Sequence, residues 1–132
     1  MKKTTKILAL LLVLVVSIFA FSACQKEAED VVITVSKDEC VIEGKFLKDY
    51  MDYLVAEGTL TYALNGTLLQ TVNGVSNGTK SYWMLYTDDA ENSDTTWGTY
   101  EKNGKTYASA MYGVSDMPIK DGCTYILTYQ TF

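Results

Sequence analysis

The chain contains no histidine and no arginine, and it has only one proline among its 132 residues. Without histidine, the usual zinc sites, Ser-His-Asp triads and Cys-His dyads cannot be built. We therefore expect a protein that is not an enzyme. Because the chain has 16 acidic and only 11 basic residues, it also lacks the basic surface that nucleic-acid binding requires. We expect no nucleic-acid partner.

Residues 1–23 have the pattern of a secretory signal peptide. Three lysines precede a run from Ile7 to Phe21 that is apolar apart from one serine. The sequence FSAC that follows resembles a bacterial lipobox, which makes Cys24 the candidate for lipidation and for the new N-terminus. The alternative is an uncleaved transmembrane helix, because the segment approaches the roughly 20 apolar residues that span a bilayer.

The rest of the chain divides into a lipid anchor with a short charged tether, residues 24–30, and one compact domain, residues 31–132. All 16 acidic residues follow the signal segment, whereas three of the lysines lie within it. Because the domain is acidic, it repels anionic lipid head groups. The attached lipid, and not the protein surface, must therefore hold it at the membrane. We expect a lipid-anchored protein on the extracytoplasmic face of the cell membrane.

The domain begins with two predicted strands in VVITVSKDECVIEG, followed by a helix over residues 45–57. In that helix the apolar residues recur at intervals of three and four, which is typical of one buried face, and Gly58 is the expected stop. The strands that follow are expected in TLTYAL, TLLQTV, SYWMLYT, a hairpin at residues 95–112 and the last segment of the chain. Asn-Gly pairs between them predict tight turns.

This order of elements predicts an α+β domain of β-grasp type, the ubiquitin-like roll. One helix would pack on a mixed sheet that carries an inserted hairpin, with the first and last strands side by side. In that topology Cys40 and Cys123 lie at opposite ends of the sheet, so we expect two separate thiols. A disulfide is the alternative, because an exported protein permits one.

An acidic segment offers oxygen ligands that could suit calcium. Its carboxylates are those of Asp88, Asp89, Glu91 and Asp94. The spacing does not match an EF-hand loop, so a solvated loop is the alternative.

Aromatic residues are a stronger indication of a binding site than the acidic segment is. The chain has ten tyrosines and two tryptophans. In SYWMLYT, alternation places Tyr82, Met84 and Tyr86 on one face of a strand, and Trp83 and Leu85 on the other. Both faces are therefore apolar, and both need a cover. The second face is covered either by the 95–112 hairpin or by a ligand.

Three separated segments, LLQTVNG, SYWMLY and GVSDMPIKDGCTYILTY, resemble the C-terminal domain of transcobalamin and intrinsic factor. That domain has an I-N-G turn, a Y-W-Q strand and a G-V-A-D-Y-x-P-x-x-G segment in the same order. The resemblance covers residues 58–132 and extends to bacterial lipoproteins whose function is mostly unassigned. It implies a β-grasp fold and corrinoid binding, with the vitamin held between this domain and a larger helical one.

The resemblance implies a binding site made of aromatic contact area and of backbone groups that meet the amides of a corrin. Its residues would be Asn73, Tyr82, Trp83, Met84, Tyr86, Gly113 and Val114. Met84 stands where the family has glutamine and cannot form the same amide hydrogen bonds. The segment 88–112 is also longer than in the animal proteins, and no helical partner domain is present on the chain.

The function expected from these observations is a surface-tethered module that binds cobalamin or a related corrinoid and delivers it to a membrane transporter. A second binding domain or the transporter would be its protein partner. One alternative is an adhesion lipoprotein whose Trp83 and Trp97 stack on a glycan or plug a partner's pocket. Another is a surface domain that presents a calcium-binding loop.

Overall fold

The computed structural model describes residues 28–36 and 45–132. The expected signal peptide, the lipidation candidate Cys24 and most of the tether lie outside these residues. So does the second of the two strands predicted in VVITVSKDECVIEG. In the described part, no helix is long and apolar enough to cross a membrane. The elements in chain order are β1 (Val31–Thr34), α2 (Leu47–Ala56), β2 (Tyr62–Asn65), β3 (Leu68–Val72), β4 (Val75–Ser76), β5 (Ser81–Thr87), the 3₁₀ helix η1 (Ala90–Asn92), β6 (Ser93–Lys102), β7 (Lys105–Ala110) and β8 (Thr124–Thr131).

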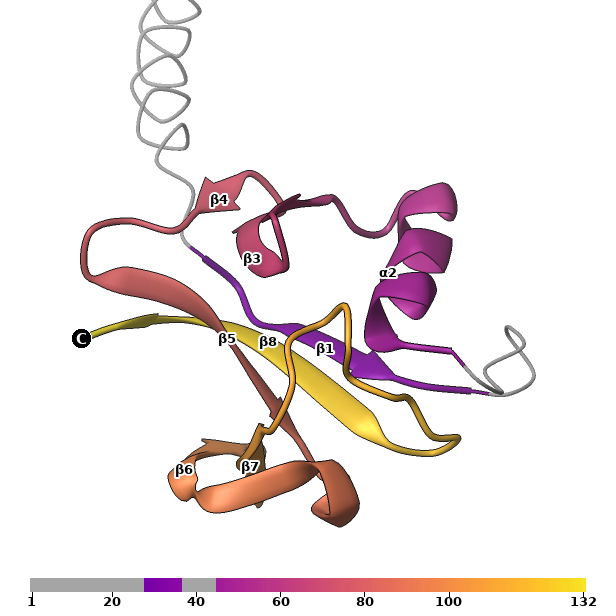
Figure 1. The fold of residues 1–132 in the computed structure, drawn as a ribbon, viewed down its shortest axis with the longest axis vertical. Coiled ribbons are helices and arrows are strands. Elements are labelled where there is room, and N and C mark those ends of the chain that lie inside the picture. Colours follow the sequence, from indigo (N-terminus) through magenta and orange to yellow (C-terminus); the bar gives the residue numbers. More distant parts are fainter. Residues whose placement is uncertain (1–27, 37–44) are drawn as a thin grey trace, which may run out of the picture.

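The strands form two antiparallel sheets beside the helix, so the expected α+β class is confirmed (Figure 1). One sheet has the order β1-β8-β5-β7-β6, and the other has the order β2-β3-β4. The first and last strands are neighbours as expected, but every strand pair in the described residues is antiparallel. The expected mixed sheet is therefore wrong for this part of the chain. Short turns close three of the pairs, and such turns permit only antiparallel neighbours.

Two of the predicted Asn-Gly turns have backbone angles that favour these residues. Asn73 and Gly74 have φ values of 47° and 82°, and Asn103 and Gly104 have values of 52° and 77°. Positive φ at both central positions gives a turn whose twist matches that of the flanking strands. The predicted hairpin around residue 103 is confirmed, since β6 and β7 pair across it.

The helix is held by the segment that connects β7 to β8. The backbone N–H of Leu47 donates to the carbonyl of Met117 at 2.8 Å, and that of Lys48 donates to Val114 at 2.9 Å. These bonds satisfy helix N-terminal donors that have no partner within the helix. Val114 and Met117 are themselves buried in the core, together with the helical residues Tyr50 and Met51.

Side-chain contacts join the two ends of the five-stranded sheet, since Asp30 before β1 binds residues of β6. In Figure 1, α2 and the smaller sheet lie on one side of β1, β8 and β5, and the β6–β7 hairpin lies on the other. The ring of Tyr100 in β6 stacks on Tyr86 in β5 with centroids 5.5 Å apart. Asp30, just before β1, accepts hydrogen bonds from the Tyr100 hydroxyl and the Lys102 ammonium group. Asp30, expected as the end of the tether, therefore belongs to the folded domain.

Each face of β5 is covered over part of the strand, and Tyr82 near its start is exposed. Trp83 belongs to the core beneath the helix and the smaller sheet, with Leu85 packed against that core, whereas Tyr86 lies under the β6–β7 hairpin. Of the two covers considered for the second face, the hairpin is the one present over Tyr86.

Two methionines test how much of the fold depends on the segment before β8. Met117 is fully buried, whereas 40% of Met111 is exposed. We expect Met117→Ala to lower the free energy of unfolding by about 2–4 kcal/mol, because it leaves a cavity where the helix and the segment meet. Met111→Ala, the same chemical change at the surface, should cost less than about 0.5 kcal/mol. Urea unfolding measures both, and equal losses would contradict this account of the core.

Candidate functional site

A groove with a volume of about 270 Å³ lies between the start of β3, the middle of β5, the end of β7 and the segment that follows it. Its lining is made of apolar, aromatic and uncharged polar residues, namely Thr67, Leu68, Leu69, Trp83, Met84, Leu85, Ser109, Ala110, Met111, Tyr112, Gly113 and Val114. An uncharged lining suits a neutral ligand, or a neutral part of a larger one.

The groove exists because β5 has a neighbour along only part of one edge. On its other side β5 pairs with β8 from Ser81 to Thr87. Towards β7, the only registered pairs in the described residues are those of Tyr86 and Thr87. Beyond this point β7 leaves β5, and the groove opens between them. An open strand edge presents backbone N–H and C=O groups that can meet the polar groups of a ligand.

Asn77 closes the far end of this edge. Its side-chain oxygen accepts the backbone N–H of Trp83 at 2.8 Å, and its amide nitrogen donates to the carbonyl of Leu69 at 2.9 Å. One side chain thus joins β3 and β5 beside the groove. At the other end of the groove, Gly113 lies near the residue before β3. A Cβ added to this glycine would be 3.6 Å from the carbonyl oxygen of Thr67.

Trp83 is held as a buried wall of the groove. Only 6% of the residue is exposed. Its indole N–H donates to the carbonyl of Val75 at 2.8 Å, and its ring lies 5.3 Å from that of Tyr129, centroid to centroid. The tryptophan therefore shapes the groove but has no free face on which a flat ligand or a sugar could stack.

The apolar side chains that are available to a ligand lie on the rim. Leu68, Met111 and Tyr112 are 53%, 40% and 47% exposed. Exposed large apolar residues grouped around a concave surface are typical of a binding site.

The structure brings together four of the seven residues that the resemblance implied. Trp83, Met84, Gly113 and Val114 all line the groove, although they come from two segments far apart in the sequence.

The other three residues lie outside the lining. Tyr86 is 5% exposed because Tyr100 covers it. Tyr82 is exposed beside Phe132, and the side-chain oxygen of Asn73 accepts the backbone N–H of Thr61, just before β2, at 2.9 Å. The expectation that Trp83 and Tyr86 offer free rings is wrong, because strand alternation gives faces without saying which neighbour covers each.

Sequence reasoning missed the rim residues Leu68, Met111 and Tyr112. Leu68 follows the Asn65-Gly66 turn, and Met111 and Tyr112 directly precede the GVSDM motif. Apolar residues next to turn signals were the available indication. Their common location depends on how the segment before β8 packs, which periodicity does not reveal.

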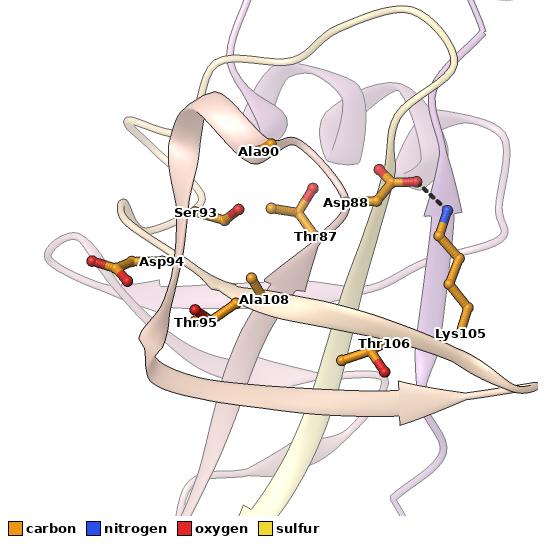
Figure 2. A pocket seen from close by; sticks show the side chains of 9 residues that line it. All are labelled: Thr87, Asp88, Ala90, Ser93, Asp94, Thr95, Lys105, Thr106 and Ala108. Atoms are coloured by element: carbon orange, nitrogen blue, oxygen red, sulfur yellow. Dashed lines mark hydrogen bonds and ion pairs between the residues drawn. The ribbon is translucent and has the colours of Figure 1, made fainter.

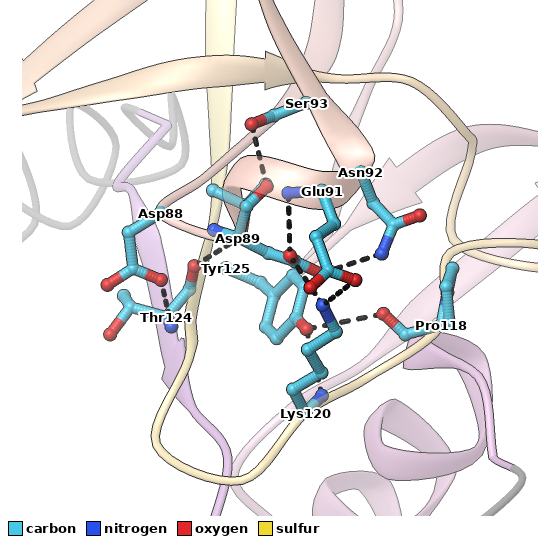
Figure 3. A network of polar contacts seen from close by, with 10 residues as sticks. Asp88, Asp89, Glu91, Asn92, Ser93, Pro118, Lys120, Thr124 and Tyr125 are labelled. Carbon is cyan, nitrogen blue, oxygen red and sulfur yellow. Dashed lines mark hydrogen bonds and ion pairs between the residues drawn. The ribbon is translucent and has the colours of Figure 1, made fainter.

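Three acidic residues of the segment 88–94 belong to a network of polar contacts, namely Asp88, Asp89 and Glu91 (Figure 3). The carboxylate of Asp89 accepts hydrogen bonds from the backbone of Glu91, the side chain of Asn92 and the ammonium group of Lys120. Asp88 pairs with Lys105 at 2.8 Å. Among the described residues, no group of three or more acidic, cysteine or histidine residues is arranged to hold a metal ion. Calcium binding stays a prediction.

Cys123 is a half-buried free thiol, and Cys40 lies outside the described residues. Burial and the carboxylates of Asp88 and Asp89 raise the pKa of the Cys123 thiol. A raised pKa keeps the thiol protonated near neutral pH, whereas the thiolate is the nucleophilic form.

No family model matches the chain, and no curated protein matches it.

Asp89 and Glu91 provide a matched test of the network, since both pair with Lys120. Only 2% of the Asp89 side chain is exposed, against 82% for Glu91. We expect Asp89→Asn to lower the free energy of unfolding by about 2–3 kcal/mol, because a charged hydrogen-bond acceptor is lost from a buried site. Glu91→Gln should cost less than about 0.5 kcal/mol. Similar losses in urea unfolding would show that burial does not decide the strength of these pairs.

The same network predicts that the stability of the protein depends on pH. Burial alone would favour protonated Asp89, but hydrogen bonds from Asn92, Lys120 and the Glu91 backbone outweigh it and lower its pKa. A lowered pKa contributes stability above the unfolded value of about 3.9, and that stability is lost as the pH falls through the folded value. We expect the free energy of unfolding to decline below about pH 4, and to decline less steeply in Asp89→Asn than in the unmodified protein. Parallel pH profiles would contradict this role.

Proposed function

We propose that this protein is a non-enzymatic, lipid-anchored binding module that holds part of a corrinoid in the groove beside β5. One observation carries the proposal. The segments LLQTVNG, SYWMLY and GVSDM, which resemble the vitamin carriers, each contribute lining residues to one cavity. They are separated in sequence, so their convergence is a property of the fold.

The chemistry of the groove supports such a ligand. A corrin has broad apolar faces, which the rim side chains of Leu68, Met111 and Tyr112 can contact. It is fringed by amides, for which the hydroxyls of Thr67 and Ser109 and the open edge of β5 supply hydrogen-bonding groups. Met84 occupies the place of the family's glutamine, so backbone groups would have to replace that amide.

The size of the groove implies partial insertion. Its volume of about 270 Å³ lies just under the usual range of about 300–1,000 Å³ for small-molecule sites. Most of a corrinoid would stay outside, where a helical binding domain or a membrane transporter could cover it. Because the domain alone contacts only part of the ligand, we expect micromolar or weaker affinity, about −8 kcal/mol at best.

The fold is consistent with an antiparallel variant of the β-grasp roll. Its supporting features are the helix α2 packed on the sheet and the adjacency of β1 and β8. In this interpretation the β6–β7 hairpin is the inserted element.

Titration with cyanocobalamin tests the proposal. The full-length protein in detergent micelles is dialysed against the vitamin, and the bound fraction is measured from the corrin absorbance. Tyr112→Ala and Met111→Ala should each weaken binding by about tenfold, because they remove rim contacts without disturbing the core.

Trp97→Ala is the matched control, because Trp97 is an aromatic residue that is more exposed than Tyr112 and does not line the groove. It should leave cyanocobalamin binding unchanged. The proposal fails if no binding occurs up to about millimolar vitamin, which corresponds to about −4 kcal/mol. It fails equally if the control variant loses as much affinity as the rim variants.

A further inference from the structure

A second cavity, of about 570 Å³, lies between the turn after β5, the start of β6 and the strand β7 (Figure 2). It shares no lining residue with the groove beside β5. Unlike the groove, it is rich in hydroxyl and charged groups. The lining residues that matter for its chemistry are Asp88, Ser93, Asp94, Thr95, Lys105 and Thr106.

An irregularity in β6 accompanies this cavity. Asp94 pairs with Ser109 and Thr99 pairs with Ala108, so residues 95–98 have no counterpart on β7. Gly98 within this bulge has a φ of 125°, which side chains other than glycine rarely permit. Bulges of this kind are frequent beside binding sites, where they redirect side chains.

The polar groups around the cavity are held in place by their neighbours. One oxygen of Asp94 accepts both the backbone N–H of Thr96 at 2.9 Å and its hydroxyl at 2.5 Å. These two donors lower the pKa of Asp94, so the carboxylate is charged at neutral pH. Asp88 is oriented by Lys105 and by the backbone N–H of Thr124. Fixed carboxylates and hydroxyls at several positions can accept and donate hydrogen bonds to a ligand with many hydroxyl groups.

The bulge also carries an exposed aromatic side chain, which is not itself part of the cavity lining. Trp97 lies two residues beyond Thr95 on the same strand, and 61% of it is exposed. It therefore contributes little to the core. An exposed indole offers a flat apolar face at low entropic cost, which suits the C–H face of a pyranose ring.

We propose that this cavity and Trp97 form a second binding site, which takes a neutral saccharide. The sugar ring stacks on the indole, and its hydroxyls bind the side chains of Ser93, Asp94, Thr95 and Thr106. Two carboxylates face a single ammonium group in the lining, so the site disfavours uronic acids and other anionic sugars. This site is independent of the corrinoid groove.

The test uses the full-length protein in a detergent whose head group contains no sugar. The probes are maltose, cellobiose and N,N′-diacetylchitobiose, with glucuronic acid as the anionic comparison. Because Trp83 is buried and Trp97 is exposed, a bound sugar should protect the tryptophan fluorescence from quenching by acrylamide. Saturation-transfer NMR on the sugar protons then measures the affinity of each variant.

We expect at least one neutral disaccharide to bind, and glucuronic acid to bind at least about tenfold more weakly. Trp97→Ala and Thr95→Val should each reduce the affinity by about fivefold or more, while Tyr112→Ala in the groove leaves it unchanged. The proposal is overturned if none of the three disaccharides binds at about 10 mM, a limit near −3 kcal/mol. It is also overturned if glucuronic acid binds as well as the neutral sugars, or if neither cavity variant weakens binding. The two proposals can fail separately. Cyanocobalamin binding in Tyr112→Ala reports on the groove alone, whereas sugar binding in Trp97→Ala and Thr95→Val reports on this cavity alone.

Discussion

The architecture depends on the insertion of one short segment, residues 113–118, between the helix and the smaller sheet. The side chains of Val114 and Met117 fill the core, while their carbonyl oxygens accept the first backbone donors of the helix. Burial of apolar area and satisfaction of helix N-terminal groups are thus achieved by the same residues. The insertion also brings Gly113 next to the start of β3, and this contact closes one end of the groove.

Local features of the chain could be predicted because local chemistry determines them. The Asn-Gly turns follow from the low cost of positive φ, and the helix follows from its apolar spacing, with Leu47, Tyr50 and Met51 on the buried face. The final strand is buried as its β-branched and aromatic composition indicates. None of these features requires knowledge of distant contacts.

Which element covers each apolar face could not be predicted, because this depends on contacts between residues that are distant in the sequence. Alternation separates Trp83 from Tyr86, but only the packing of Tyr100 and the ion pair between Lys102 and Asp30 show which face the hairpin covers. The full candidate site could not be predicted for the same reason. The resemblance indicated Trp83 and Gly113, whereas the exposed rim at Met111 and Tyr112 becomes evident only when β7 diverges from β5.

The two cavities differ in chemistry, since one is uncharged and apolar and the other is rich in hydroxyls and carboxylates. The proposed function requires that the uncharged groove receives a corrinoid. The most direct measurement is NMR of the protein with ¹³C-labelled methionine methyl groups during addition of cyanocobalamin. Met84 and Met111 line the groove, while Met51 and Met117 are fully buried in the core. Binding in the groove should shift the methyl signals of the first pair and leave those of the second pair unchanged. Uniform shifts, or none at saturating vitamin, would contradict it.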